Sequence, residues 1–258
     1  MAQTIAVLSQ KGGTGKTTTV RMLTDVLRRI GVQTLAVDLD PQGNLSDYFD
    51  LPPDSEPTIA DVLAGTAAAR EAIHDGVIPA SLNLAETELM LGGKIGREMT
   101  LRRALAGVQG DWEIVLVDCP PSLGLLTVNA LVAADYALVT AEAQYFALQG
   151  VEQAMEVIEI ARDSLNDELS LIGVLLNLAD MRTVHSREAK ASLKERFGEG
   201  VFNTVVRGSI AYAESAERAV SILDHRPDLG ADYVAVADEL LERLPGMGSA
   251  RARLAQLR

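Results

Sequence analysis

Short apolar runs alternate with longer amphipathic stretches along most of the chain. The apolar or β-branched runs lie at residues 4–10, 33–40, 113–122, 136–143, 169–180 and 201–207. Residues 17–31, 150–165 and 231–244 instead repeat apolar side chains three or four positions apart, which predicts helices. Strands that alternate with helices pair in parallel and are covered on both faces. The pattern therefore predicts an α/β fold, with a doubly wound, mostly parallel and twisted sheet flanked by helices.

The first predicted helix is the clearest. Val20, Leu23, Leu27 and Ile30 line one face of it, and Gly31 is expected to end it. The proline-containing stretch 51–110 is expected to be a looser excursion before the sheet resumes. No linker divides the chain, so we expect a single domain over residues 1–245 and a short basic tail over 246–258.

Composition narrows the class of protein. The chain has 258 residues and 48% hydrophobic residues, which suffices for a core and argues against disorder. Its single cysteine, Cys119, fits a reducing cytoplasm, and neither a signal peptide nor a membrane-spanning run is expected. The net charge of −13 and an aromatic content of 4% disfavour nucleic-acid binding by the average surface. Any such binding would need a local basic patch.

The stretch SQKGGTGKTTT at residues 9–19 lies between a predicted strand and a predicted helix, as a phosphate-binding loop does. Gly15, Lys16 and Thr17 match the end of the pattern G-x-x-x-x-G-K-[ST], whereas Gln10 replaces its first glycine and Lys11 is extra. In such a loop, backbone N–H groups and the helix N-terminus face the phosphates. We expect Lys16 to contact the β- and γ-phosphates and the Thr17 hydroxyl to hold Mg²⁺.

Two acidic segments end at the same edge of the predicted sheet as this loop. In VDLDPQGN, Asp40 is our candidate for positioning the water that attacks the γ-phosphorus, because Pro41 ends the strand there and Asp38 lies deeper. In IVLVDCPPS, an apolar strand delivers Asp118, which we expect to order the Mg²⁺ shell. Cys119 is expected to be a small buried neighbour.

Three motifs together resemble the ParA/MinD family of ATPases. KGGTGKTT (11–18) is similar to the deviant Walker A motif of that family, DLDPQGN to its Walker A′ and DCPPSLGLLTVNAL to its Walker B and switch segment. The likeness runs from about Thr4 to Leu244 and is greatest to the ParA/Soj branch. The motifs are specific for the family and much less so for its cargo.

The resemblance implies a site and an assembly. The residues that it assigns to ATP are Lys11, Gly12, Gly13, Thr14, Gly15, Lys16, Thr17, Thr18 and Asn177. It implies that Lys11, Lys16 and Asp40 are catalytic and that Thr17, Asp40 and Asp118 surround Mg²⁺. Two subunits would enclose two ATP molecules, and Lys11 would reach the phosphates of the other subunit. Asn177 would recognise adenine through its amide; the alternative is a buried polar cap at a strand end.

The chain departs from the family where ParA proteins of the Soj type bind non-specific DNA. Gly208 and Ala211 occupy positions of arginines, and Arg207 that of a proline. Residues 182–218 nevertheless hold seven cations against five acids. Arg187, Lys190 and Lys194 are spaced to share a helical face, which either contacts DNA or is simply solvated.

The tail contains Arg251, Arg253 and Arg258 but few large apolar residues, so we expect a frayed end or an auxiliary nucleic-acid contact rather than a membrane anchor. The predicted function is a cytoplasmic ATP-dependent homodimer that switches in chromosome or plasmid partitioning, with slow hydrolysis stimulated by a ParB-like or adaptor protein. It would be nucleoid-associated if it binds DNA. The alternatives are an ATPase that positions a protein cargo or the division machinery, a small-molecule ligase of the same fold, and a MinD-like membrane switch.

Overall fold

A parallel sheet of seven strands forms the centre of the computed structural model, which describes residues 2–144 and 146–256. The strand order is β3-β2-β4-β1-β5-β6-β7, and all the paired strands are parallel. The strands are β1 (Gln3–Leu8), β2 (Thr34–Asp38), β3 (Val77–Ile78), β4 (Ile114–Asp118), β5 (Tyr136–Glu142), β6 (Ser170–Ala179) and β7 (Val201–Arg207). This arrangement confirms the predicted fold class.

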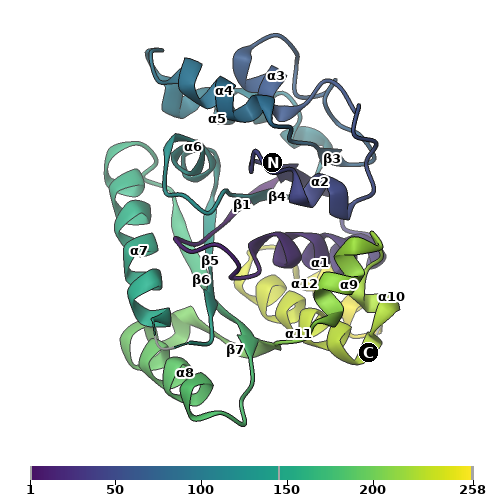
Figure 1. Ribbon diagram of the computed structural model, residues 1–258, viewed down its shortest axis with the longest axis vertical. Helices are drawn as coiled ribbons and strands as arrows, with labels where there is room; N and C mark the ends of the chain where they lie inside the picture. The colour runs from purple at the N-terminus through teal and green to yellow at the C-terminus, as the bar shows by residue number, and fades with distance from the viewer. Residues whose placement is uncertain (1, 145, 257–258) are drawn as a thin grey trace.

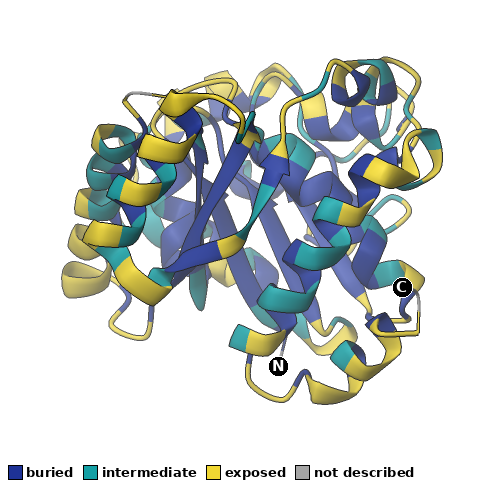
Figure 2. Cartoon of the chain, turned by 90° about the horizontal axis from the view of Figure 1, so that it is seen from below, coloured by how far each residue is buried: buried dark blue, intermediate teal, exposed yellow. Residues whose placement is uncertain are grey.

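Helices cover both faces of the sheet (Figure 1). One face packs against α3 (Ile59–Ala64), α4 (Asn83–Leu91), α5 (Thr100–Ala106), α6 (Leu125–Ala133), α7 (Ala147–Ser164) and α8 (Val184–Phe197). The other packs against α1 (Lys16–Arg29), α2 (Asn44–Tyr48), α9 (Ala211–Glu217), α10 (Ile222–His225), α11 (Pro227–Arg243) and α12 (Gly248–Leu254). Strands β1 to β5 are almost wholly buried between these two apolar cores, whereas β6 and β7 also contain exposed positions. Most other exposed positions lie on the outer helices and loops (Figure 2).

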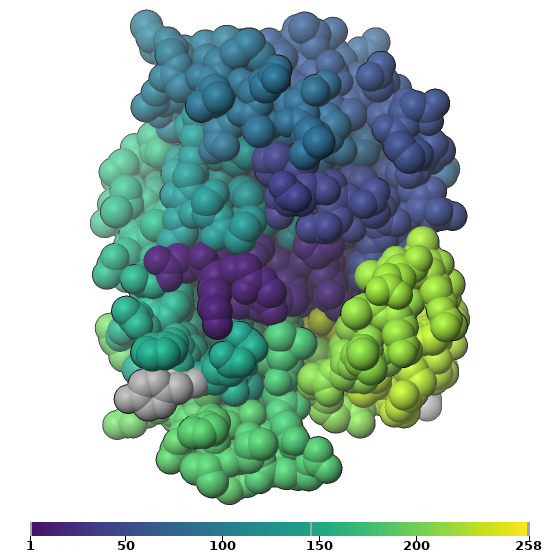
Figure 3. All heavy atoms as spheres, in the orientation of Figure 1, coloured from purple at the N-terminus to yellow at the C-terminus, as the bar shows by residue number. Residues whose placement is uncertain are grey.

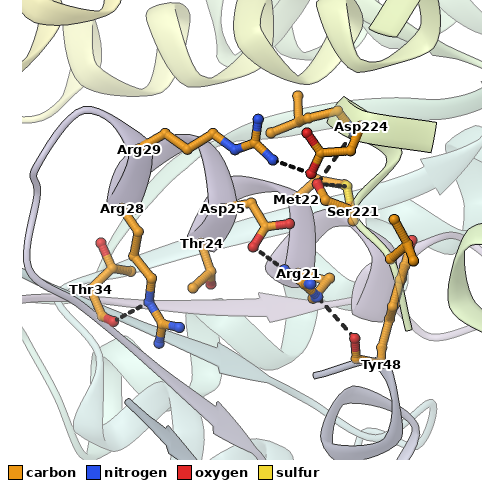
Figure 4. A network of polar contacts seen from close by, with 12 residues as sticks. Arg21, Met22, Thr24, Asp25, Arg28, Arg29, Thr34, Tyr48, Ser221 and Asp224 are labelled. Atoms are coloured by element: carbon orange, nitrogen blue, oxygen red, sulfur yellow. Dashed lines mark hydrogen bonds and ion pairs between the residues drawn. The ribbon is translucent and has the colours of Figure 1, made fainter. Parts of the chain in front are cut away.

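Helix α1 connects the binding loop to the core. Val20, Leu23 and Leu27 are fully buried as predicted, and Gly31 follows the helix with a φ of +74°, a conformation that glycine adopts readily. Polar residues of the same helix tie it to its neighbours (Figure 4). Arg21 donates to the carbonyl oxygen of Tyr48 on α2 at 3.0 Å, and Arg28 donates to that of Thr34 on β2 at 3.1 Å. The helix is therefore fixed on both its apolar and its polar side.

The stretch 51–110 is more regular than expected. It contains α3, β3, α4 and α5, and its strand β3 adds to the edge of the sheet beside β2. Two residues are too few to show an alternating pattern, which is why β3 was not predicted. Helix α6 was also missed, because its residues are apolar on nearly every side and show no helical period.

The predicted basic tail differs from the expectation of a frayed end. Residues 248–254 form helix α12, and Leu254 is fully buried in the core that α1 and α11 share. Arg253 donates to the carbonyl oxygen of Ile30 at 2.6 Å, and Arg251 pairs with Asp238 at 3.0 Å. Arg258 lies outside the described residues. The described helices include none with the length and apolar character needed to cross a membrane.

Candidate nucleotide site

The loop at residues 9–15 is folded around its own hydroxyl groups. Ser9 Oγ donates to the carbonyl oxygen of Lys11 at 2.8 Å and lies 2.8 Å from Thr14 Oγ1. Thr14 Oγ1 in turn lies 2.9 Å from Thr140 Oγ1 on β5, a residue that sequence reasoning did not connect with the site. Gly13 and Gly15 have φ values of +77° and +82°. The loop is thus shaped by left-handed glycines and attached to the neighbouring strand.

The amino end of α1 has the features of an anion-binding site. Gly15 precedes the helix without a side-chain cap, and the first turn contains no acidic residue. Its backbone N–H groups and the helix dipole therefore favour a negatively charged ligand. A Cβ atom at Gly15 would lie 2.8 Å from Nδ2 of Asn177, so a larger residue does not fit there.

Lys16 lies beneath this loop rather than in solvent. Its side chain is buried, and Nζ donates to Ser9 Oγ at 3.2 Å. Burial lowers the pKa of Lys16, and the nearby carboxylate of Asp118 partly offsets that effect. The ammonium group has few partners for a buried charge, which suits a position where phosphate oxygens complete its environment.

Asp118 is a buried carboxylate at the end of β4. It is 1% exposed, and neither carboxylate oxygen has a hydrogen-bond partner among the described residues. Burial and the neighbouring Asp38 raise its pKa, whereas the adjacent Thr17 and Lys16 lower it. The described residues contain no cluster of three or more metal-ligating side chains. Mg²⁺ usually takes one or two carboxylates together with phosphates and waters, so Thr17 and Asp118 fit it.

Asp38 and Asp40 have different surroundings. Asp38 is fully buried and accepts from the Ser46 amide at 2.9 Å, the Ser46 hydroxyl at 2.8 Å and the Asp40 amide at 3.1 Å. Burial raises its pKa to about 6 despite these bonds. Asp40 instead lines the open cavity, and its Oδ1 accepts from the Gln42 amide at 3.0 Å. Asp38 thus holds the turn between β2 and α2 in place, while Asp40 lines the cavity beside the phosphate-binding loop.

A cavity of about 840 Å³ lies beside the loop, within the roughly 300–1,000 Å³ typical of ligand sites. We call it the nucleotide cavity; its lining includes Gly12, Gly13, Gly15, Lys16, Thr17, Thr18, Asp40, Tyr48, Pro121, Leu178, Ala216 and Ala219. The purple segment that contains the loop lies near the middle of the face in Figure 3, next to the yellow-green segment that carries α9. The wall formed by Leu178 and the α9 region has no motif and was not predicted.

Asn177 supports the loop from the end of β6. Its Nδ2 donates to the carbonyl oxygen of Thr14 at 2.8 Å and lies 3.2 Å from Thr19 Oγ1. Its Oδ1 is buried without a hydrogen-bond partner in the described part of the chain. The amide nitrogen thus joins the strand to the loop, as the alternative of a buried polar cap predicts. The recognition of adenine by Asn177 stays a prediction.

Lys11 differs from Lys16 in the direction of its side chain. Its side chain is 62% exposed, and Nζ lies 3.2 Å from Oε2 of Glu142 at the end of β5. It does not line the nucleotide cavity, whereas Lys16 does. The two lysines of the loop therefore point to different places, one inward to the anion site and one outward to the surface.

The basic stretch 182–218 is largely engaged in contacts within the protein. Arg182, Arg196 and Arg207 pair with Asp180, Glu152 and Asp232. Lys190 and Lys194 share one face of α8 as predicted, and both donate to Asn203 of β7, at 2.8 and 2.7 Å. Arg187 donates to backbone carbonyl oxygens of the preceding turn. These contacts leave Arg218, exposed at the end of α9, as the cation of this set with the fewest partners.

The fold and the loop together define the class of protein: this is a P-loop ATPase. A family profile described as an AAA domain matches residues 2–171. The chain is 36% identical to the sporulation initiation inhibitor protein Soj of Bacillus subtilis, over 93% of this chain and 98% of that protein. It is also 36% identical to the chromosome partitioning protein ParA of Caulobacter vibrioides, over 93% of this chain and 94% of the other. The chain therefore belongs to the ParA/MinD family of ATPases.

A solved structure supports the choice of ligands. A Mycobacterium smegmatis protein named cobyrinic acid a,c-diamide synthase, determined with ADP and magnesium, is 36% identical to the chain. The two superpose with a TM-score of 0.77, over 87% of this chain and 95% of that one. The same protein is also known with an ATP analogue and magnesium. ATP and Mg²⁺ are accordingly the ligands that this fold and this loop accommodate.

Proposed function

We propose that the chain is an ATP-dependent dimeric switch in DNA partitioning, reset by hydrolysis. The observation that carries this proposal is the position of Lys11, which belongs to the phosphate-binding loop but points out of its own nucleotide cavity. A long exposed cation at this place is suited to neutralising charge on a nucleotide held by a second subunit. The names of the relatives from Bacillus subtilis and Caulobacter vibrioides support the cellular role.

The same edge of the sheet carries exposed apolar side chains, which supports a face-to-face dimer. Phe146, Leu178, Val184 and Ile210 are between 37% and 77% exposed. Leu178 lies at the carboxyl end of β6, and the other three follow the carboxyl ends of β5, β6 and β7, the edge at which the loop lies. Apolar side chains gathered on one face are typical of an interaction surface. Closure of two protomers over their nucleotides would bury them.

Within each protomer we assign the roles as follows. Lys16 and the backbone of residues 12–15 hold the phosphates, and Thr17 and Asp118 hold Mg²⁺, which neutralises phosphate charge when bound. Asp40, which faces the nucleotide cavity from the turn after β2, orients the attacking water and accepts its proton. Lys11 of the other protomer completes the charge around the γ-phosphate. Because Lys11 arrives only on closure, hydrolysis by a single protomer is expected to be slow.

The closed dimer is the state that we expect to bind partners. A ParB-like or adaptor protein would stimulate hydrolysis and return the dimer to monomers. If DNA is not the surface that the dimer binds, the alternative is an ATPase that positions a protein cargo. The name of the Mycobacterium smegmatis relative, a synthase, favours the alternative of a small-molecule ligase, which predicts turnover that depends on a metabolite rather than on a protein.

The substitution Asp40→Ala tests the proposed cycle. Without the carboxylate that orients water, ATP binding and closure should persist while hydrolysis stops, so D40A should accumulate as a dimer in ATP and Mg²⁺. Size-exclusion chromatography with light scattering, in ATP and in ADP, measures this. Asp47→Ala removes another carboxylate at the rim of the same cavity and should behave as the wild type. A monomeric D40A in ATP, or equal dimerisation of D47A, would contradict the role of Asp40.

A further inference from the structure

The contact between Lys11 and Glu142 has no place in the cycle described above. It is an ion pair of 3.2 Å between the loop and the last residue of β5, with side chains 62% and 21% exposed. The second carboxylate oxygen, Oε1, accepts from Gln144 Nε2 at 2.5 Å. Gln144 therefore fixes one oxygen of the Glu142 carboxylate, while the other oxygen pairs with Lys11.

Strand β5 contacts the loop at two positions. Thr140 and Glu142 are two residues apart, so their side chains lie on the same side of the strand. Thr140 holds Thr14 in the buried part of the loop, and Glu142 holds Lys11 at its exposed tip. The first contact fixes the shape of the loop, and the second fixes the direction of its one outward-pointing cation.

We propose that Glu142 is a positioning residue that retains Lys11 in an inactive orientation until a second subunit is present. This inference rests on the proposed dimer, because it concerns the position from which Lys11 must leave. In the free protomer Lys11 is paired with Glu142, and on closure it exchanges this carboxylate for the phosphates of the other subunit's nucleotide. Glu142 thereby opposes closure and makes dimerisation depend more strongly on ATP.

The expected effect is modest, because exposed ion pairs are weak. Removing a contact of this kind changes an equilibrium by about two- to fivefold. The substitution Glu142→Gln keeps the size of the side chain and removes its charge. In the D40A background, E142Q should lower the dissociation constant of the ATP-bound dimer by about two- to fivefold, as measured by sedimentation at a series of protein concentrations. Glu142→Asp, which retains the carboxylate, should remain closer to the parent.

A double-mutant cycle separates this effect from a general change in charge. With Lys11→Ala also present, E142Q should have no effect on dimerisation, because the retained cation is gone. Asp111→Asn removes one carboxylate of another exposed ion pair, that with Arg70, and should leave the dissociation constant unchanged. An equal effect of E142Q with and without Lys11, or weaker dimerisation of E142Q, would overturn the proposal.

A measurement on the monomer distinguishes this inference from the proposed function. Without nucleotide, the acylation rate of the Lys11 amine, followed by mass spectrometry, should be higher in E142Q than in the parent and unchanged in D111N. If that rate rises but ATP produces no dimer in any variant, the retention of Lys11 stands and the dimeric switch fails. If the rate is the same in E142Q and the parent, Glu142 does not retain Lys11 and the inference fails by itself.

Discussion

At the scale of single residues, the site is dominated by a carboxylate that the protein alone does not satisfy. Asp118 is buried at the end of β4, and neither oxygen has a hydrogen-bond partner among the described residues. Its pKa remains raised even though Lys16 lies nearby, so the attraction of that lysine does not repay the cost of burial. An ionised Asp118 therefore destabilises the free protein, and a bound cation would offset this cost.

Asp118→Asn should reveal this cost. In the absence of nucleotide and Mg²⁺, D118N should raise the free energy of unfolding by about 1–3 kcal/mol, because a buried unpaired charge is removed. In Mg²⁺ and ATP the order should reverse, since the wild type gains ligand binding that D118N loses. Urea denaturation with and without ligand measures both. Asp135→Asn is the matched control: Asp135 Oδ2 accepts from the Thr4 amide at 2.7 Å, so this variant should not be stabilised.

The sequence predicts some residues of the site and not others, for a physical reason. Lys16, Thr17, Asp40 and Asp118 stand directly at strand ends or in a loop whose spacing is itself the signal. Thr140 and Glu142 contact the loop across 126 and 131 residues of sequence, and no local pattern records such a pairing. Ser46 is only eight residues from Asp38, yet a serine in the short helix α2 gives no indication in the sequence that it hydrogen-bonds a buried carboxylate.

At the scale of elements, amphipathic helices could be predicted from their repeating apolar face. The central strands could be predicted from short apolar runs, because they are buried on both faces of the sheet. Helix α1 shows the pattern over its whole length, whereas β3 is too short and α6 too uniformly apolar to show it. Helix α12 was not predicted, for a different reason. Its composition is basic, but two of its apolar residues, Ala250 and Leu254, are buried in the core. Composition alone does not reveal whether the few apolar side chains of a segment are buried in the core.

Leu254→Ala tests whether α12 contributes to the domain. Truncation of a fully buried leucine should lower the free energy of unfolding by about 2–4 kcal/mol, through lost burial and the cavity left behind. Chemical denaturation provides the measurement. Gln256→Ala changes an exposed residue just after the same helix and should have little effect. A leucine that could be removed without loss would mean that the helix is only loosely attached in solution.

At the scale of the whole molecule, the net negative charge of the chain disfavours the proposed binding of DNA. The chain carries a net charge of −13, and three arginines of its basic stretch are neutralised by acids of the same protein. The proposed binding of DNA would therefore rest on few cations in each protomer. The proposed ATP-bound dimer would bring together the cations of two protomers, which would make DNA binding depend on ATP.

The trapped D40A dimer should bind duplex DNA weakly and with strong dependence on salt. If about two to four phosphates are neutralised, affinity should fall by about 10- to 150-fold between 50 and 200 mM salt. An electrophoretic shift at the two salt concentrations measures this. Arg218→Ala should weaken binding and reduce the salt dependence, whereas Arg182→Ala removes a cation that Asp180 already neutralises and should change little. A dimer that shows no ATP-dependent, salt-sensitive shift would favour a protein cargo.

The attachment of the loop to β5 limits how far its sequence can be moved to another protein. In the proposed site, Lys16 and the backbone of residues 12–15 hold the phosphates, but the shape of the loop and the direction of Lys11 depend on contacts with Thr140 and Glu142. A graft of the loop onto a different P-loop scaffold would be expected to transfer nucleotide affinity without the control exerted through Lys11. Engineering of this switch therefore has to treat the loop and the end of β5 as one transplantable unit.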